Sequence, residues 1–270
     1  MFEIFKAVIF GIVQGISEWL PISSTGHMIL LNEFLPLNFS KEFVDTFLVV
    51  VQLGSILAVV VLYFHKLWPF SSKKTKKQKR DTWELWFKVL AAVIPAGVVG
   101  VLFEEQINAI FYGALPVAAT LILYGVLFIL IERKPRTPRI NNIHELSYKT
   151  ALLIGVFQVL ALVPGTSRSG ATILGAVLLG CSRYEASEFS FFLAIPMMFG
   201  ASLLKLLKAG FGFGGLEWAV LAAGSLVAFG VSLWAIRFLL NYIRRHDFTA
   251  FGYYRIILGA IIFVYFFLLS

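Results

Sequence analysis

The stretch GIVQGISEWLPISSTGHM, from Gly11 to Met28, decides how this chain can be arranged. It lies inside an apolar N-terminal segment, yet it gathers polar side chains within fourteen residues: Gln14, Glu18, Ser23, Ser24, Thr25 and His27. Polar and ionisable groups are costly inside a bilayer, so a cluster of them marks a functional site by default. We therefore interpret this stretch as part of a site and not as a plain membrane span.

A second stretch, GVFQVLALVPGTSRSGAT from Gly155 to Thr172, has the same plan. Each stretch runs from an apolar helix with a glutamine, through a proline, into a turn rich in Ser, Thr and Gly. Pro21 and Pro164 each remove a backbone donor and interrupt a helix. Irregular backbone cannot face lipid, so each stretch is predicted to be a buried re-entrant hairpin. We expect the two turns to face one another and to share one phosphate.

The composition places the whole chain in a membrane. Of its 270 residues, 59% are hydrophobic, and the net charge is +8, whereas ordinary soluble domains are less apolar. The basic residues gather in short loops such as Lys73 to Arg80, which is typical of loop orientation and contact with anionic headgroups and argues against nucleic-acid binding. A helix needs roughly 20 apolar residues to cross a bilayer. Apolar runs of this length lie near 45–64, 85–103, 115–132, 187–208, 217–239 and 250–269.

The order of segments is the same twice, one interrupted segment followed by three spans. The predicted fold is therefore an all-α integral membrane protein with six transmembrane helices and two re-entrant hairpins in an inverted-topology repeat. The first repeat would be 1–132, a cytoplasmic connection 133–149, and the second repeat 150–270. Basic residues place both the loop after the first span and this connection in the cytoplasm. Those of the connection are Arg133, Lys134, Arg136 and Arg139. Glu104 and Glu105 fit a loop on the outside.

The first turn carries a carboxylate, hydroxyls and a histidine. Gln14 and Glu18 share one helix face, and their oxygens could hold a hard cation such as Mg²⁺ or Ca²⁺; alternatively, Glu18 could act as a general base. The run after Pro21 is typical of a helix N-terminus, which binds phosphate through free N–H groups, here at Ser23, Thr25 and Gly26. Ser24 and His27 are spaced for nucleophilic attack, with the histidine taking or giving the proton.

The second turn repeats this pattern with a guanidinium, which is the preferred bidentate partner of phosphate. Its candidate phosphate-binding residues are Ser167, Arg168, Ser169, Gly170 and Thr172. Beyond it, Arg183, Glu185 and Glu188 are at least as consistent with structural ion pairs as with catalysis. The chain has no nucleotide-binding P-loop motif and no zinc-ligand spacing. Together the two turns indicate cleavage of a phosphoanhydride or phosphomonoester on a lipid substrate.

At this point the motifs resemble those of a known family. QGISEWLPISSTGHM and PGTSRSGATI, with QLGSILAVV and RYEASEFSFFLAIPMM beyond them, resemble the bacterial undecaprenyl-diphosphate phosphatases, the bacitracin-resistance protein family. The resemblance implies hydrolysis of a polyprenyl diphosphate left by cell-wall assembly to the monophosphate carrier and phosphate. It implies six spans with two re-entrant hairpins in the bacterial plasma membrane, a site open to the periplasmic or outer side, and a divalent cation (Mg or Ca).

Roles carry over position by position. Glu18 matches the family's essential motif glutamate, Ser24 its proposed nucleophile, His27 its motif histidine and Arg168 its phosphate-binding arginine. Gln14 stands where the family has Glu or Gln, so a metal site of two carboxylates is not available here. The resemblance leaves room for a homodimer, which the sequence itself does not indicate. The alternative function is a transporter or flippase of polyprenyl phosphate lipids, which the inverted repeat alone would suit.

Overall fold

The computed structural model describes residues 1–111, 113–134 and 137–269, and Arg136 of the predicted connection lies outside them. Within these ranges the regular structure is helical, apart from one isolated β-bridge between Ile140 and Cys181. The chain order is α1 (Phe2–Ser17), α2 (Ser24–Phe34), α3 (Lys41–Val50), α4 (Gln52–Leu62), α5 (Phe64–Leu67), α6 (Lys76–Phe111), α7 (Ala114–Glu132), η1 (Ile143–Glu145), α8 (Tyr148–Val159), η2 (Leu160–Leu162), α9 (Arg168–Leu178), α10 (Arg183–Ala209), α11 (Gly215–Ile243), α12 (Thr249–Val264) and η3 (Tyr265–Leu269).

Six helical segments of the described chain are long and apolar enough to cross a membrane, which confirms the predicted number of spans. The first of them joins α3 and α4, and the others are formed by α6, α7, α10, α11 and α12. Many large apolar side chains on these segments are exposed, as expected where lipid replaces water. The segments are Lys41–Leu62, Lys76–Phe103, Ala114–Glu132, Arg183–Ala209, Gly215–Ile243 and Thr249–Phe267.

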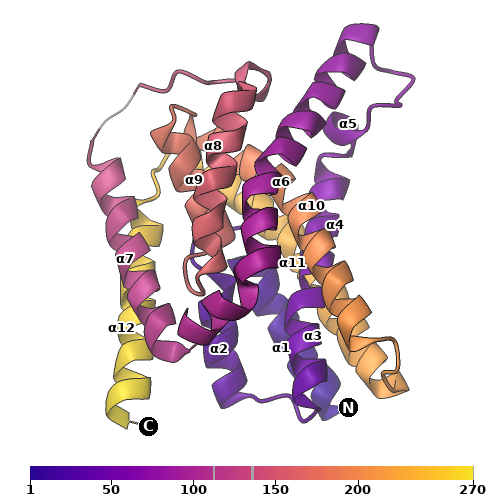
Figure 1. Ribbon diagram of the computed structural model, residues 1–270, viewed down its shortest axis with the longest axis vertical. Helices are drawn as coiled ribbons and strands as arrows, with labels where there is room; N and C mark the ends of the chain where they lie inside the picture. The colour runs from indigo at the N-terminus through magenta and orange to yellow at the C-terminus, as the bar shows by residue number, and fades with distance from the viewer. Residues whose placement is uncertain (112, 135–136, 270) are drawn as a thin grey trace.

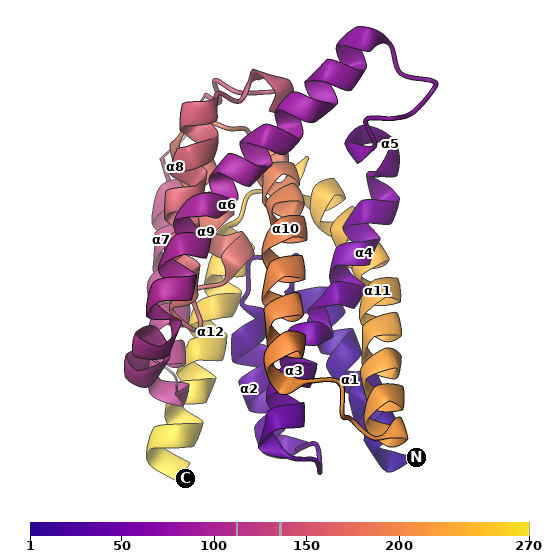
Figure 2. The same ribbon diagram turned by 45° about the vertical axis from the view of Figure 1, so that its right-hand side comes forward.

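Two pairs of shorter helices lie between these spans. α1 and α2 have 16 and 11 residues, and α8 and α9 have 12 and 11, all below the roughly 20 needed to cross. α1 and α2 occupy the lower half of the molecule and α8 and α9 the upper half (Figures 1 and 2). The turns that follow α1 and α8 therefore meet near the middle, and both chain termini lie at the lower end (Figure 1).

Close helix packing holds the two pairs in place. α1 lies against α11, and α8 lies against α6. The contacts are close at Gly11 and Gly155, where an added Cβ would collide with the facing backbone at Gly224 and Ala92 respectively. Because only glycine allows such a close approach, these two positions determine how closely α1 packs on α11 and α8 on α6.

One predicted loop is absent. α6 continues through Glu104 and Glu105 to Phe111, so the prediction that these two residues form a loop between spans is wrong. The segment between Gly100 and Gly113 contains neither Gly nor Pro and is rich in good helix formers. The helix therefore runs on beyond its apolar portion.

Candidate active site

The two turns have the same backbone geometry. Ser23 and Ser167 are the non-glycine residues with positive φ in the described chain, at 70° and 72°. Each precedes a helix, and its hydroxyl accepts a hydrogen bond from the backbone N–H three residues on, Gly26 at 3.4 Å and Gly170 at 3.1 Å. This is the N-cap interaction that serine favours. The predicted helix N-termini are confirmed, since α2 begins at Ser24 and α9 at Arg168.

Glu18 lies at the centre of the site. Its carboxylate is 4% exposed, and Oε2 accepts hydrogen bonds from Gln14 Nε2 and from Ser24 Oγ, both at 3.0 Å. Oε1 forms an ion pair with Arg168 Nη2 at 3.2 Å. One carboxylate thus connects the hydroxyl of the first turn to the guanidinium of the second, as expected if the turns share a site.

The Arg168 guanidinium is oriented by α10. Its Nη1 donates to the Ser190 carbonyl at 2.6 Å and to Ser190 Oγ at 3.2 Å. Thr172 lies behind it, with Oγ1 2.7 Å from Ser190 Oγ. Arg168 Nε is buried and has no hydrogen-bond partner in the described chain. The guanidinium is therefore held in place, while its Nε stays unpaired among the described residues.

His27 is oriented away from Ser24. Its Nδ1 donates to the Ser23 carbonyl at 2.8 Å, which leaves Nε2 to accept from the Tyr254 hydroxyl at 2.7 Å. The two rings also stack with centroids 5.6 Å apart. The structure thus gives Ser24 a different partner from the one that sequence spacing predicts, Glu18 in place of His27.

The other predicted phosphate-binding residues frame the site without all facing it. Ser169 Oγ donates to the Glu18 carbonyl at 3.1 Å and lies 3.1 Å from Ser167 Oγ, which ties one turn to the other. Gly26 and Gly170 supply the capped N–H groups. Thr25 is exposed on the first turn of α2. Ser169 therefore has a structural part, and the Gly26 and Gly170 N–H groups are hydrogen-bonded to the capping serine hydroxyls.

Sequence reasoning missed Arg255 in α12. This residue is fully buried, and its guanidinium donates to the carbonyls of Pro21 at 3.1 Å, Gly165 at 3.0 Å and Thr166 at 2.9 Å. In the described part of the chain no carboxylate pairs with it. A lone arginine within the last apolar run was the available signal, since such residues in a span are rare and usually functional. Arg255 clamps the two turns together.

The site fits a divalent cation only with help from the substrate. Gln14 Oε1 is buried next to the Glu18 carboxylate and has no hydrogen-bond partner in the described ranges. Among the described residues, no group of three or more His, Cys, Asp or Glu could hold a metal ion. Mg²⁺ is commonly held by one or two carboxylates together with substrate phosphates. One amide oxygen and one carboxylate fit that arrangement, in which a diphosphate would complete the coordination.

Comparison with known proteins agrees with the resemblance of the motifs. A family model described as "Bacitracin resistance protein BacA" matches residues 7–261. The chain is 61% identical to "Undecaprenyl-diphosphatase 1" of Clostridioides difficile, covering 100% of this chain and 98% of the relative. It is 60% identical to "Undecaprenyl-diphosphatase" of Acetivibrio thermocellus, covering 98% of each, and 57% identical to that of Enterococcus faecalis, covering 97% of each. On this full-length similarity, the chain belongs to the bacitracin resistance protein BacA family.

Proposed function

We propose that this chain is a membrane phosphatase that hydrolyses undecaprenyl diphosphate to undecaprenyl phosphate and phosphate, which recycles the lipid carrier for cell-wall synthesis. The observation that carries this function is the Glu18 carboxylate, which contacts both Ser24 and Arg168. Relatives named for this activity match the chain over its full length. Ser24 as nucleophile, Glu18 as base and the Arg168 guanidinium as the group that binds phosphate then lie in one site.

In the proposed reaction, Ser24 attacks the terminal phosphorus. Glu18 Oε2, already hydrogen-bonded to Ser24 Oγ, takes the hydroxyl proton as the Oγ–P bond forms. The bond from this phosphorus to the bridging oxygen breaks, and undecaprenyl phosphate leaves with the proton. Water then attacks the phosphoserine and gives one proton to Glu18. The Oγ–P bond breaks, Glu18 returns that proton to Ser24 Oγ, and phosphate leaves.

Arg168 and the N-terminus of α2 would stabilise the negative charge of the transition state. The guanidinium carries the positive charge, with its Nε unpaired among the described residues, and the helix N-terminus offers N–H groups beside Ser24. Both favour the charge that builds on the phosphoryl oxygens in the transition state. His27 would hold the turn through the Ser23 carbonyl and Tyr254, which makes it a positioning residue in this scheme.

Gln14 and Glu18 are the residues that would hold a divalent cation, Mg²⁺ or Ca²⁺, together with the substrate. When bound, the cation would neutralise diphosphate charge and polarise the reacting phosphoryl group. Gln14 also keeps Glu18 in place through its Nε2 donor, a contribution that does not depend on the cation.

We further propose that α1 with α2, and α8 with α9, are re-entrant hairpins of an inverted repeat. Three observations support this. The helices are too short to cross; their turns share the unusual serine geometry; and α1 packs on α11 of the second half as α8 packs on α6 of the first. The first repeat would be 1–132 and the second 150–270, joined by 133–149.

The proposed location is the bacterial plasma membrane, with the site open to the outer side. The Lys-rich segment from Lys73 to Arg80, which includes the start of α6, lies at the end opposite the chain termini (Figure 1). This supports a cytoplasmic position for that end. Cysteines introduced at Ser72 and Gly113 in a Cys181→Ser background should react with an impermeant reagent from opposite sides. Reaction from one side only would contradict the inverted arrangement. A homodimer stays a prediction from the resemblance.

Transport of polyprenyl phosphate lipids is the alternative, and a repeat of opposite orientation is the feature that favours it. The decisive experiment is phosphate release from undecaprenyl diphosphate by purified protein in detergent, with and without a chelator. A detergent micelle does not separate two compartments, so the phosphate released cannot result from transport. We expect release that falls when the chelator is added. Absence of release by folded protein would contradict the phosphatase function.

A further inference from the structure

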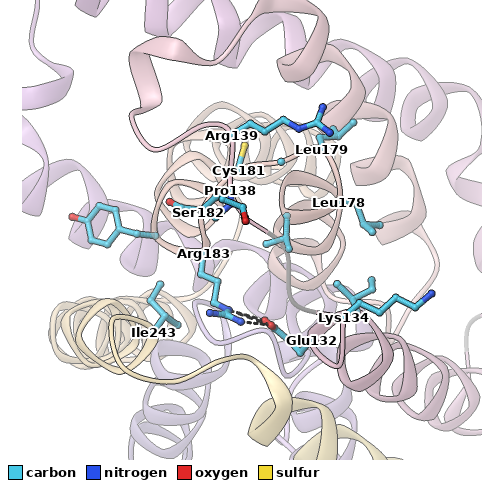
Figure 3. A pocket seen from close by; sticks show the side chains of 15 residues that line it. Glu132, Lys134, Pro138, Arg139, Leu178, Leu179, Cys181, Ser182, Arg183 and Ile243 are labelled. Atoms are coloured by element: carbon cyan, nitrogen blue, oxygen red, sulfur yellow. Dashed lines mark hydrogen bonds and ion pairs between the residues drawn. The ribbon is translucent and has the colours of Figure 1, made fainter.

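A cavity of about 640 Å³ lies away from the proposed active site, where three candidate spans end. α7 ends at Glu132, α10 begins at Arg183 and α11 ends at Ile243, and all three residues line the cavity (Figure 3). Its volume is within the range of small-molecule pockets. A pocket at the ends of spans lies at the level of lipid headgroups, whichever side of the membrane it faces.

The lining combines an apolar wall with an excess of positive charge. Three basic side chains, Lys134, Arg139 and Arg183, face one acidic side chain, Glu132. Arg183 is already neutralised, because its Nε lies 2.9 Å from Glu132 Oε1 and its Nη2 2.5 Å from Oε2. The apolar wall is formed by Ile131, Val177, Leu178, Leu179 and Ile243.

Lys134 and Arg139 are the two cations left over. Neither has an acidic partner within the described ranges, and both are exposed. Figure 3 draws the Leu178 side chain between theirs, and Leu178 is itself 37% exposed. Two unpaired cations therefore flank an apolar surface, which matches the charged head and the hydrocarbon chain of an amphiphile.

The edge of the cavity that carries Arg139 is held by backbone hydrogen bonds. The N–H groups of Arg139 and Ile140 both donate to the Gly180 carbonyl, at 2.8 and 3.0 Å, and the Ser182 N–H donates to the Ile140 carbonyl at 2.9 Å. The aliphatic part of Arg139 lies over Gly180, which has a φ of +99°. The segment that places this cation is thus anchored to the end of α9.

We propose that this cavity binds the phosphate headgroup of an anionic phospholipid, with Lys134 and Arg139 at the phosphate and an acyl chain along the wall at Leu178. Basic pockets between spans are favourable for such headgroups. A zwitterionic headgroup would bring no net charge to the two cations, and free phosphate would leave the apolar wall exposed. This binding is separate from hydrolysis, since the residues that line the cavity are not those of the two turns.

Native mass spectrometry of the full-length protein tests the proposal, with phosphatidylglycerol or phosphatidylcholine added at equal concentration. We expect preferential retention of phosphatidylglycerol, and a loss of at least about tenfold in its affinity in Lys134→Gln/Arg139→Gln, because each basic group near a headgroup contributes appreciably. The matched control is Lys73→Gln/Lys77→Gln, which removes the same charge from exposed positions outside the cavity. The control should retain the lipid, and phosphate release should be unchanged in both variants.

A second variant and two competitors keep the interpretation sharp. Leu178→Glu, at a partly exposed position, should also weaken retention by placing a negative charge on the wall. Equal loss in the two double variants, or no preference over phosphatidylcholine, would overturn the proposal in favour of general charge attraction. Inorganic phosphate that competes as well as the lipid would indicate a free-anion site. Undecaprenyl phosphate that is retained in preference to phosphatidylglycerol would indicate a product site, and either result would also overturn the proposal.

Discussion

The turn before α2 and the turn before α9 have nearly the same backbone and very different chemistry. Ser23 and Ser167 share a positive φ within two degrees of one another, and both cap a glycine N–H. Yet the first turn brings Glu18 and Ser24, whereas the second brings Arg168. The repeated backbone thus gives both halves the same geometry, while the side chains divide the proposed reaction between them.

The largest effect should come from the nucleophile of the first turn. Ser24→Ala should reduce turnover by more than about 1000-fold, since loss of a nucleophilic serine can cost about 10⁶ in kcat. Ser23→Ala, which keeps Ser24, should be milder. Enzyme quenched rapidly with substrate labelled in its terminal phosphate should carry acid-stable label on Ser24. Label on His27, or near-normal turnover of Ser24→Ala, would exclude the serine mechanism.

The next effect concerns the carboxylate that joins the turns. Glu18→Gln retains the size of the side chain but removes the base and the partner of Arg168, so turnover should fall at least about 100-fold. The measurement is phosphate release, with thermal unfolding as a check that the variant is folded. Near-normal release from a folded variant would remove Glu18 from the reaction and leave only its structural contacts.

Arg168→Lys tests the second turn alone. Lysine keeps the charge but not the planar fork that contacts Ser190 and Glu18 together, so kcat should fall by about tenfold or more. The rate with Arg168→Gln should be lower still, because that variant also removes the charge. Full activity in Arg168→Lys would reduce the residue to a point charge and weaken the division of labour between the turns.

The smallest effect should separate the two glutamines, which stand at matching places in the halves. Gln14→Leu should raise the cation concentration for half-maximal activity by about tenfold, by analogy with losses around metal sites. Gln158 is buried with both amide atoms unpaired in the described chain, so Gln158→Leu should leave activity unchanged. It should stabilise the fold by about 1 kcal/mol, because an unpaired buried polar group is removed. Equal effects on the cation dependence would contradict a site at Gln14.

Much of the fold was accessible from sequence because two signals coincide at the turns. Pro21 and Pro164 interrupt helices where Ser, Thr and Gly follow, and α2 and α9 begin just beyond them. Pro95 and Pro196, in contrast, lie inside α6 and α10, since no run of turn residues follows them. Proline alone is therefore a weak boundary signal, and the residues after it decide the outcome.

The contacts within the site were less accessible. Spacing along one helix places His27 within reach of Ser24, but it cannot reveal that Tyr254, more than two hundred residues later, donates a hydrogen bond to the His27 ring and stacks on it. Arg255 escaped for a related reason, because its partners are carbonyls of two distant turns and leave no pattern of their own. The sequence predicted that the two turns share a site but not that Glu18 pairs with Arg168. The structure shows this ion pair between Glu18 Oε1 and Arg168 Nη2.

The clamp at Arg255 also has a consequence for biosynthesis. The two turns lie in the first and second halves of the chain, but the guanidinium that joins their carbonyls is at position 255 of 270. A ribosome must therefore deliver almost the entire polypeptide before the turns can be locked against one another. We expect a chain that stops before Thr249 to insert into the membrane and yet release no phosphate, so that unfinished copies would not hydrolyse the cell's lipid carrier.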